Sequence, residues 1–373
     1  MSEWKECKLG DFADITMGQS PKSENYNDFG EGLPFLQGNR TFGSRYPLID
    51  TYCTDPKKIA NEGEILFSVR APVADINIAN RKICIGRGLA SFNAKNQQNL
   101  FLFYLLHFIK GDIINSESGT VYGSVNKKDL ESVSILLPPL PEQKAIASVL
   151  SSLDDKIDLL HRENQTLEQI AETLFRQWFV EEASEDWEEI LLNDIYMFDK
   201  GFEPGSRNYL ENKEADSIRF IRVGDMLDLK ASTYIKKEPG QITCGKKDLL
   251  VSFDGTIGRV SFGIEGAYSS GIRKVYSLDP IYNSLGLKYL LFTSREIQDV
   301  IKSHSSGTVI AHAGSSIDYL TFRFPKKNRL QEFNQITDPM FFKITKNLDQ
   351  IETLEKLRNN LLPKLISGEV RVI

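Results

Sequence analysis

The sequence predicts an α+β protein: two tandem-repeat domains of mixed α/β structure, joined by two long helices packed as an antiparallel coiled coil with a pseudo-twofold axis. Three observations predict it. A sequence repeat spans the chain, short apolar runs alternate with turns in each copy, and a heptad pattern follows each copy. With 373 residues, 41% of them apolar, the chain is long enough to bury several cores.

Four ordered matches carry the repeat. Trp4 and Leu9-Gly-Asp11 recur as Trp187 and Leu192-Asn-Asp194, at an offset of 183 residues. The other matches pair 34–39 with 219–225, 64–73 with 248–257, and Ser-Gly-Thr-Val at 118–121 with the same four residues at 306–309. Because the order is kept and the offset drifts only slowly, we interpret the chain as a tandem duplication.

Each copy begins with a strand-rich domain, which we place at 1–139 and 184–327. Short apolar runs bounded by turn residues predict the strands. In the first copy they are LPFLQGN, EILFSV, ICIG and VSILLP; in the second they are RFIRV, DLLVSF, GRVSFG, KVYSL and LTFRFP. One helix per copy is predicted, over 99–109 and over 285–301.

A long helix follows each domain, over 140–183 and over 328–373. Residues from Ile146 to Trp178 follow alternating steps of four and three, with Asn164 in the seam. Adding 187 keeps this register in the second helix, with Asn347 and Arg358 as polar interruptions. Such a stripe often faces only its own domain, but two matched copies favour a coiled coil. Antiparallel pairing is the simplest closed arrangement, because a whole domain separates the helices.

The charge distribution leaves a nucleic-acid partner open. The net charge is −6, but residues 140–183 alone carry four basic and nine acidic groups. Both domains are therefore nearly neutral and can each carry a local basic face. No run is long and apolar enough to span a membrane, and no signal-peptide pattern is present. The four scattered cysteines suit a reducing cytoplasm, where we expect the protein.

Catalytic motifs are absent from the sequence, so we expect no enzyme activity, no cofactor and no metal in this chain. Asp338-Pro-Met-Phe341 is only faintly similar to the Asp/Asn-Pro-Pro-aromatic motif of amino-methyltransferases, since Met340 replaces the second proline. We interpret this segment as a proline break at the start of a helix.

The candidate DNA-binding residues are polar and basic side chains in turns and at strand ends. Amides and guanidinium groups of this kind can read base edges. Any one of them alone is better interpreted as a solvated surface charge, but together they favour contact with a nucleic acid. In the first copy they are Gln37, Asn39, Arg40, Arg45, Arg70, Arg87, Tyr122, Ser124, Asn126, Lys127 and Lys128, the last group forming a basic loop. In the second copy they are Arg222, Asp225, Arg259, Arg273, Lys274, His312 and Ser315.

Four segments resemble the specificity subunit of type I restriction–modification systems. Leu137-Pro-Pro-Leu-Pro-Glu-Gln143 is similar to that family's exit from its first target-recognition domain, and 361–371 is similar to its C-terminal ending. Gly63-Glu-Ile-Leu-Phe-Ser68 and Ser118-Gly-Thr120 resemble signatures inside its recognition domains. The second copy departs from the pattern at 326–332, so the start of the second helix is less sharply defined.

This resemblance implies two target-recognition domains, each reading one half of a bipartite, asymmetric site in double-stranded DNA, with the helices setting the spacing. It implies as partners modification subunits, two in number, that bind S-adenosylmethionine and methylate adenine, and restriction subunits that hydrolyse ATP. The acidic first helix is a candidate docking face for the modification subunits, and a merely solubilising face is the alternative. Two alternatives remain open: an orphan DNA-binding regulator, and an adaptor that pairs two protein ligands.

Overall fold

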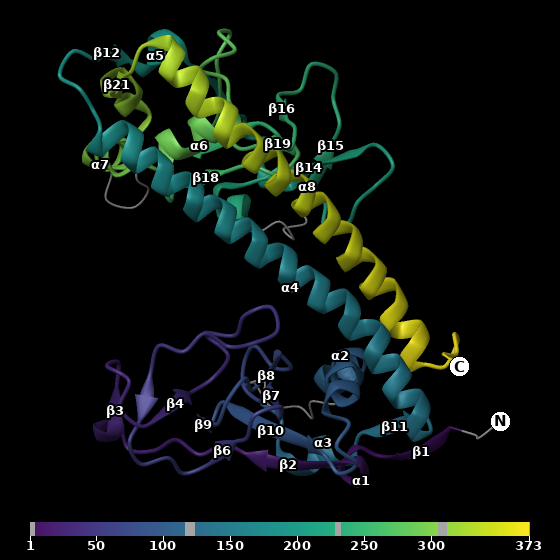
Figure 1. Cartoon of the computed structure of the whole chain (residues 1–373). Helices are drawn as coiled ribbons and strands as arrows, with labels where there is room; N and C mark the ends of the chain where they lie inside the picture. The colour runs from purple at the N-terminus through teal and green to yellow at the C-terminus, as the bar shows by residue number, and fades with distance from the viewer. Residues whose placement is uncertain (1–3, 116–123, 228–232, 305–311, 373) are drawn as a thin grey trace. The chain divides into compact units, whose positions relative to one another are not determined.

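The protein is described here by a computed structural model covering residues 4–115, 124–227, 233–304 and 312–372. The chain divides into two compact units. Unit 1 comprises Met1–Ile157 and Thr353–Ile373, and unit 2 comprises Asp158–Glu352. The division falls within the two long helices (teal and yellow in Figure 1), so each unit contains a segment of both.

Unit 1 contains three sheets. A four-stranded antiparallel sheet has the order β2-β10-β7-β8, a five-stranded sheet has the order β3-β5-β4-β9-β6, and β1 pairs with β11. Their bounds are β1 Lys5–Lys8, β2 Ala13–Met17, β3 Tyr26–Asn27, β4 Leu33–Leu36, β5 Tyr52–Cys53, β6 Ile59–Ala60, β7 Ile65–Ser68, β8 Ile76–Ile78, β9 Ile83–Ile85, β10 Leu89–Ala94 and β11 Ser134–Leu137.

Unit 2 repeats these sheet orders. The order β13-β20-β17-β18 corresponds to β2-β10-β7-β8, and β12 pairs with β21 as β1 pairs with β11. The order β15-β14-β19-β16 corresponds to β5-β4-β9-β6 of the five-stranded sheet, including its parallel pair. The bounds are β12 Glu188–Leu191, β13 Met197–Lys200, β14 Ser217–Ile221, β15 Tyr234–Lys236, β16 Thr243–Cys244, β17 Leu249–Ser252, β18 Val260–Ser261, β19 Gly266–Tyr268, β20 Ile272–Tyr276 and β21 Thr321–Phe324. These matching orders agree with the internal sequence repeat.

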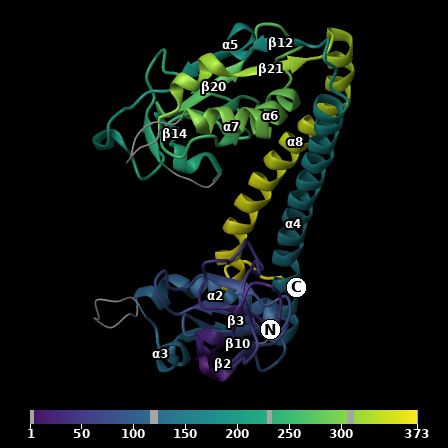
Figure 2. The same ribbon diagram turned by 90° about the vertical axis from the view of Figure 1, so that its left-hand side faces the viewer.

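Helices cover the four-stranded sheets and complete the cores. In unit 1, α2 (Asn99–Asn115) buries Phe101, Leu105 and their neighbours against the sheet. In unit 2 the prediction of one helix over 285–301 is wrong, because two helices, α6 (Leu285–Thr293) and α7 (Arg295–Ser303), occupy the segment (Figure 2). Ser294 leaves the helical conformation and accepts a hydrogen bond from the Ile297 N–H, which starts α7. The short helices are α1 Leu9–Phe12, α3 Lys127–Ser132 and α5 Leu192–Ile195.

The two long helices are α4 (Leu140–Arg176), continued by a π turn at Gln177–Glu181, and α8 (Lys327–Ile366). Every predicted seam position on both helices is buried or half-buried. The reading of Pro339 as a break at a helix start is wrong, since it lies within α8. An interior proline removes one backbone hydrogen bond, and the helix continues past it with Phe341 and Ile344 packed in the core of unit 2.

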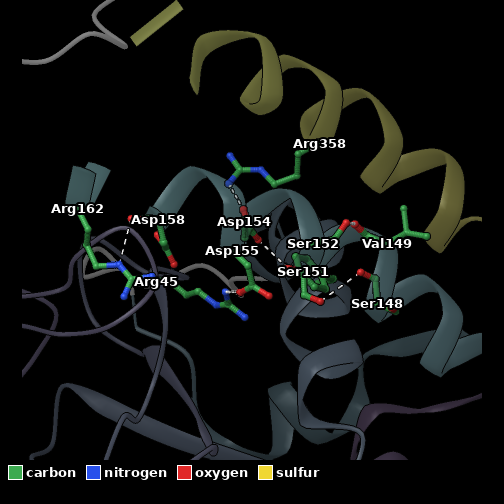
Figure 3. Close-up of polar contacts among 11 residues, drawn as sticks. Arg45, Ser148, Val149, Ser151, Ser152, Asp154, Asp155, Asp158, Arg162 and Arg358 are labelled. Atoms are coloured by element: carbon green, nitrogen blue, oxygen red, sulfur yellow. Dashed lines mark hydrogen bonds and ion pairs between the residues drawn. The ribbon is translucent and has the colours of Figure 1, made fainter. Parts of the chain in front are cut away.

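Polar side chains fix the pairing of α4 with α8 inside each unit. In unit 2, Asn347 Nδ2 donates to Asn164 Oδ1 at 2.7 Å, so the two predicted seam asparagines contact each other directly. In unit 1, Arg358 Nη1 donates to the buried Asp154 carboxylate at 2.6 Å (Figure 3). Tyr104 also donates to Asp154, at 2.6 Å, and burial raises the pKa of this phenol, so it remains a donor. The Asp154–Arg358 contact pairs an early residue of α4 with a late residue of α8, as in antiparallel helices.

A salt bridge closes the start of each long helix. In unit 1 Glu142 of α4, which is 7% exposed, accepts hydrogen bonds from Arg371 beyond α8 and from the Trp4 indole. In unit 2 the acidic and basic partners are exchanged: the residue at the helix start is Arg329 of α8, and it donates to Glu182, which lies beyond α4. We call these contacts the unit 1 clasp and the unit 2 clasp.

Two other features of the described residues bear on function. No helix among them is long and apolar enough to cross a membrane. Within the same part of the chain, no three histidine, cysteine, aspartate or glutamate side chains gather in a way that could hold a metal ion.

Replacing Arg358 by methionine should lower the free energy of unfolding by about 2–4 kcal/mol, because the buried Asp154 carboxylate loses its charged partner. Urea unfolding of the full chain measures this. The control is Arg295→Met, which removes an exposed ion pair with Asp299 and should cost less than about 1 kcal/mol. Equal losses for both variants would mean that the Arg358 contact does not stabilise unit 1.

Candidate nucleic-acid interface

Four loops of unit 1 lie side by side and are connected, each to the next, by backbone hydrogen bonds. The Gly88 N–H donates to the Gln37 carbonyl at 3.1 Å, and the Val69 N–H donates to the Gly88 carbonyl at 2.9 Å. The Val125 N–H then donates to the Val69 carbonyl at 3.1 Å, beside a β-bridge between Arg70 and Ser124. The structure therefore brings together four predicted site residues, Gln37, Arg70, Arg87 and Ser124, which we call the first loop edge.

Unit 2 builds the same edge on equivalent residues. The Phe253 N–H donates to the Gly271 carbonyl at 2.8 Å, and the Ala313 N–H donates to the Phe253 carbonyl at 2.7 Å. A β-bridge joins Asp254 to His312, as Arg70 joins Ser124. Strand register makes Arg222 equivalent to Gln37 and Ser270 equivalent to Arg87. The second loop edge is therefore Arg222, Asp254, Ser270 and His312.

A serine at the end of the central strand shapes the turn behind each edge. Ser68 Oγ donates to the Pro72 carbonyl at 2.7 Å and accepts from the Asp75 N–H at 2.8 Å. Ser252 makes the same two contacts, with the Thr256 carbonyl at 2.6 Å and the Arg259 N–H at 2.8 Å. The same two hydroxyl contacts therefore hold the turn behind both edges.

The side chains that tie this turn to the neighbouring loop differ between units. In unit 1, Asn39 Nδ2 donates to Asp75 Oδ2 at 2.5 Å. In unit 2, Arg259 Nη1 donates to the Val223 carbonyl at 2.8 Å. Asn39 and Arg259 are both predicted site residues. In each, one side-chain nitrogen donates a hydrogen bond that connects two loops.

On the first loop edge, Ser20 links two predicted residues. Its hydroxyl donates to Gln37 Oε1 at 2.9 Å and accepts from the Arg87 N–H at 3.2 Å. The side chains of Arg70 and Arg87 are exposed. Arg40 is exposed as well, but Asp50 pairs with it at 2.7 Å, and this hydrogen bond lowers the pKa of the Asp50 carboxyl.

Arg45 lies away from the solvent. It is 8% exposed, and its Nη1 donates to Asp155 of α4 at 2.5 Å (Figure 3). Burial is the largest single effect and opposes its charge, but the hydrogen bond to Asp155, together with the electrostatic effects of Asp155, Tyr46 and Tyr104, raises the pKa of the guanidinium. This side chain holds its loop against α4, so we leave it out of the candidate surface.

The segment predicted as a basic loop at 122–128 ends in a helix. Tyr122 lies outside the described residues. Asn126 caps α3, since its Oδ1 accepts from the N–H groups of Lys128 at 2.9 Å and Asp129 at 3.1 Å. Lys127 and Lys128 are exposed in the first turn of α3, with Lys127 3.5 Å from Glu131.

The remaining predicted residues of unit 2 have varied surroundings. Arg222 and Asp225 pair with each other, through contacts of 2.8 and 3.2 Å. Arg273 is 8% exposed and donates to the Ser270 carbonyl at 2.6 Å, and burial lowers the pKa of its guanidinium. Lys274 is half-buried in β20, its ammonium 5.6 Å from the Tyr276 ring centroid. Ser315 is exposed in the short 3-10 helix Gly314–Tyr319.

Sequence reasoning missed Asp254 and Ser270. Neither is basic, and a search for cations and amides passes over them. The repeat itself could have identified them, because an offset of 184 from Arg70 falls on Asp254 and an offset of 183 from Arg87 falls on Ser270. Together the two edges offer guanidinium, amide, hydroxyl, imidazole and carboxylate groups, which are the groups that hydrogen-bond to base edges and phosphates.

Comparison with known proteins identifies relatives of both halves. A family model described as the type I restriction modification DNA specificity domain matches residues 1–169. The specificity subunit of the type I restriction enzyme MjaX from Methanocaldococcus jannaschii is 47% identical over 170 residues, which cover 44% of this chain and 40% of that protein. The MjaIX specificity subunit of the same organism is 24% identical over 412 residues, covering 99% of this chain and 94% of the relative.

A solved structure shares the fold. The crystal structure of a type I restriction–modification S subunit from M. genitalium matches 97% of this chain and 96% of its own, with a TM-score of 0.60 and 17% identity. The sequence matches lead to one assignment: residues 1–169 match the DNA specificity domain of type I restriction–modification systems, and nearly the whole chain is similar to the specificity subunits of such systems.

Proposed function

We propose that this chain is the DNA-reading subunit of a type I restriction–modification complex, in which each unit reads one half of a bipartite, asymmetric DNA site. Specificity subunits of this family are not themselves catalytic. The observation that carries the proposal is the pair of loop edges, which share one backbone arrangement and present different side chains. Two edges with the same backbone arrangement and different side chains are suited to reading two DNA half-sites of different sequence.

The recognition domains in this proposal are residues 1–139 and 184–327. The contacts to DNA come from the first loop edge with Asn39, Arg40, Lys127 and Lys128, and from the second loop edge with Arg259, Lys274 and Ser315. Exposed cations such as Arg70, Arg87 and Lys128 contact phosphates or guanine, while amides and hydroxyls read base edges. Because the net charge is −6, binding depends on these local groups and not on the charge of the whole chain.

The helices 140–183 and 328–373 form an antiparallel coiled coil with a pseudo-twofold axis in this proposal. The Asn164–Asn347 and Asp154–Arg358 contacts support that pairing, as does the offset of 187 residues between the two seams. The coiled coil sets the spacing of the half-sites. Its acidic first helix docks modification subunits, two in number, which bring S-adenosylmethionine, while restriction subunits bring ATP.

Exchange of residues 1–139 for the matching domain of another specificity subunit tests the modular reading. The exchange should change one half of the methylated sequence and leave the other half and the gap unchanged, because each edge lies within one unit. Methylation-sensitive sequencing of DNA from cells that express the chimera with its modification subunits measures this.

The same experiment separates the alternatives. A change in both half-sites would contradict modular reading. DNA binding by the isolated chain, with no methylated sites in any complex, would favour a regulator, and no DNA binding under any condition would favour a protein adaptor.

Replacing Lys127 and Lys128 together by alanine should reduce the salt dependence of DNA binding by about one to two units of slope, as expected for the loss of one or two phosphate contacts. The measurement is a titration of labelled DNA with the assembled complex at several salt concentrations. The matched control replaces Arg81 and Lys82, two exposed cations in the turn between β8 and β9. If the test variant and the control share the wild-type slope, the lysines are not DNA contacts.

Lengthening both helices by one heptad should widen the gap between half-sites by about 3 base pairs. Seven residues add about 10 Å at 1.5 Å per residue, and B-DNA rises about 3.4 Å per base pair. The insertions belong after Ile157 and after Glu352, where the units divide, so that every contact within each unit is kept. The methylated sequences of the variant give the gap. An unchanged gap in an active complex would mean that the helices do not set it.

A further inference from the structure

The bridged pair at the centre of each loop edge differs in charge between the units. Arg70 and Asp254 both stand two residues beyond the equivalent strands β7 and β17, each bridged to the loop that follows the helical region. The preceding residues, Val69 and Phe253, make matching backbone hydrogen bonds on both sides. One backbone position therefore carries a guanidinium in unit 1 and a carboxylate in unit 2.

The carboxylate in unit 2 is held in a defined orientation. His312 Nδ1 lies 2.8 Å from Asp254 Oδ1, and the Asp254 side chain is 23% exposed while that of His312 is 60% exposed. Arg273 lies buried near this pair, so that a guanidinium of β20 is close to the Asp254 carboxyl group. A carboxylate has lone pairs on both oxygens, so it can accept a further hydrogen bond while His312 holds Oδ1.

An acidic group at a DNA-reading edge is costly unless it reads a base. Phosphates repel it, and it has no hydrogen to donate to N7, O6 or O4 acceptors of the major groove. The donors that the major groove offers are the exocyclic amino groups, N4 of cytosine and N6 of adenine. Arginine has the opposite preference, because its fork of N–H groups matches guanine O6 and N7.

We infer that this bridged position determines base choice: Asp254, oriented by His312, accepts a hydrogen bond from an exocyclic amino group of cytosine or adenine, whereas Arg70 donates to guanine. The two residues act in different half-sites. Asp254 is the reading residue and His312 is a positioning residue. The inference rests on the proposed function, since it assigns a base class to an edge already proposed to contact DNA.

The first test maps methylated sites for Asp254→Asn in the full chain, expressed with its modification subunits. Asparagine keeps the shape but adds a donor, so the required base at one position of one half-site should relax or change, with the other half-site and the gap intact. The matched variant Arg70→Gln should alter one position of the other half-site only. Continued methylation with an unchanged sequence for Asp254→Asn would overturn the inference while leaving the proposed function in place.

A second test uses the unaltered protein, so it does not depend on how a variant folds. Once the half-site is mapped, the complex is titrated with duplexes in which 2-pyrimidinone replaces cytosine, or purine replaces adenine, at the affected position. Each analogue lacks only the amino group. Affinity should fall about tenfold to a hundredfold for one of them, which identifies the base.

His312→Asn separates positioning from reading. It should weaken discrimination at the same base pair without creating a new preference, since the carboxylate remains but is no longer oriented. Equal affinity of the wild-type complex for both analogues and for natural DNA would overturn the inference. Absence of any bipartite methylation by the wild-type complex would instead contradict the proposed function itself.

Discussion

The register between α4 and α8 is the constraint on which the rest of the structure depends. An apolar seam alone permits sliding by one heptad, because each step presents similar leucine and isoleucine side chains. The Asn164–Asn347 pair and the Asp154–Arg358 pair each have one good alignment. Misalignment would leave a buried carboxylate or amide unpaired, which costs more than the contact contributes when formed. These few polar groups therefore select one pairing of two helices that are 37 and 40 residues long.

That pairing makes distant parts of the sequence complete each unit. Leu365 and Ile366 belong to the core of unit 1, although the whole of unit 2 separates them in sequence from residues 1–157. The clasps reinforce this arrangement with opposite polarity, Glu142 with Arg371 in unit 1 and Arg329 with Glu182 in unit 2. The start of α4 and the segment beyond it are both acidic, whereas the start of α8 and the segment beyond it are both basic. The start of each helix therefore attracts the segment beyond the other helix and repels the segment beyond its own.

The parts of the fold that follow a periodic pattern of apolar residues could be predicted from the sequence. The parts that depend on a contact between two individual residues could not. The seam residues, Asn164 and Asn347 among them, follow from the heptad pattern. Ser294 divides a predicted helix because its side chain caps α7, a contact that a continuous apolar pattern conceals. Arg45 has the sequence context of a surface loop, yet Asp155, which lies 110 residues away, pairs with it. Asp254 was missed because it became notable only when its backbone was matched to that of Arg70.

The loop edges separate what holds the fold together from what varies. Backbone hydrogen bonds and the Ser68 and Ser252 hydroxyls form the framework, so the side chains at positions 70, 87, 254 and 270 can change without loss of a framework contact. Residues that serve the framework, such as Asn126 and Arg273, do not have this freedom, because their polar groups are committed to backbone partners. A repeated scaffold with interchangeable side chains at a few exposed or half-buried positions allows the two halves of one chain to diverge in what they contact while both remain stable. The fixed register of α4 and α8 therefore holds the scaffold in place. Because the scaffold does not depend on the side chains of the loop edges, those side chains can differ between the units.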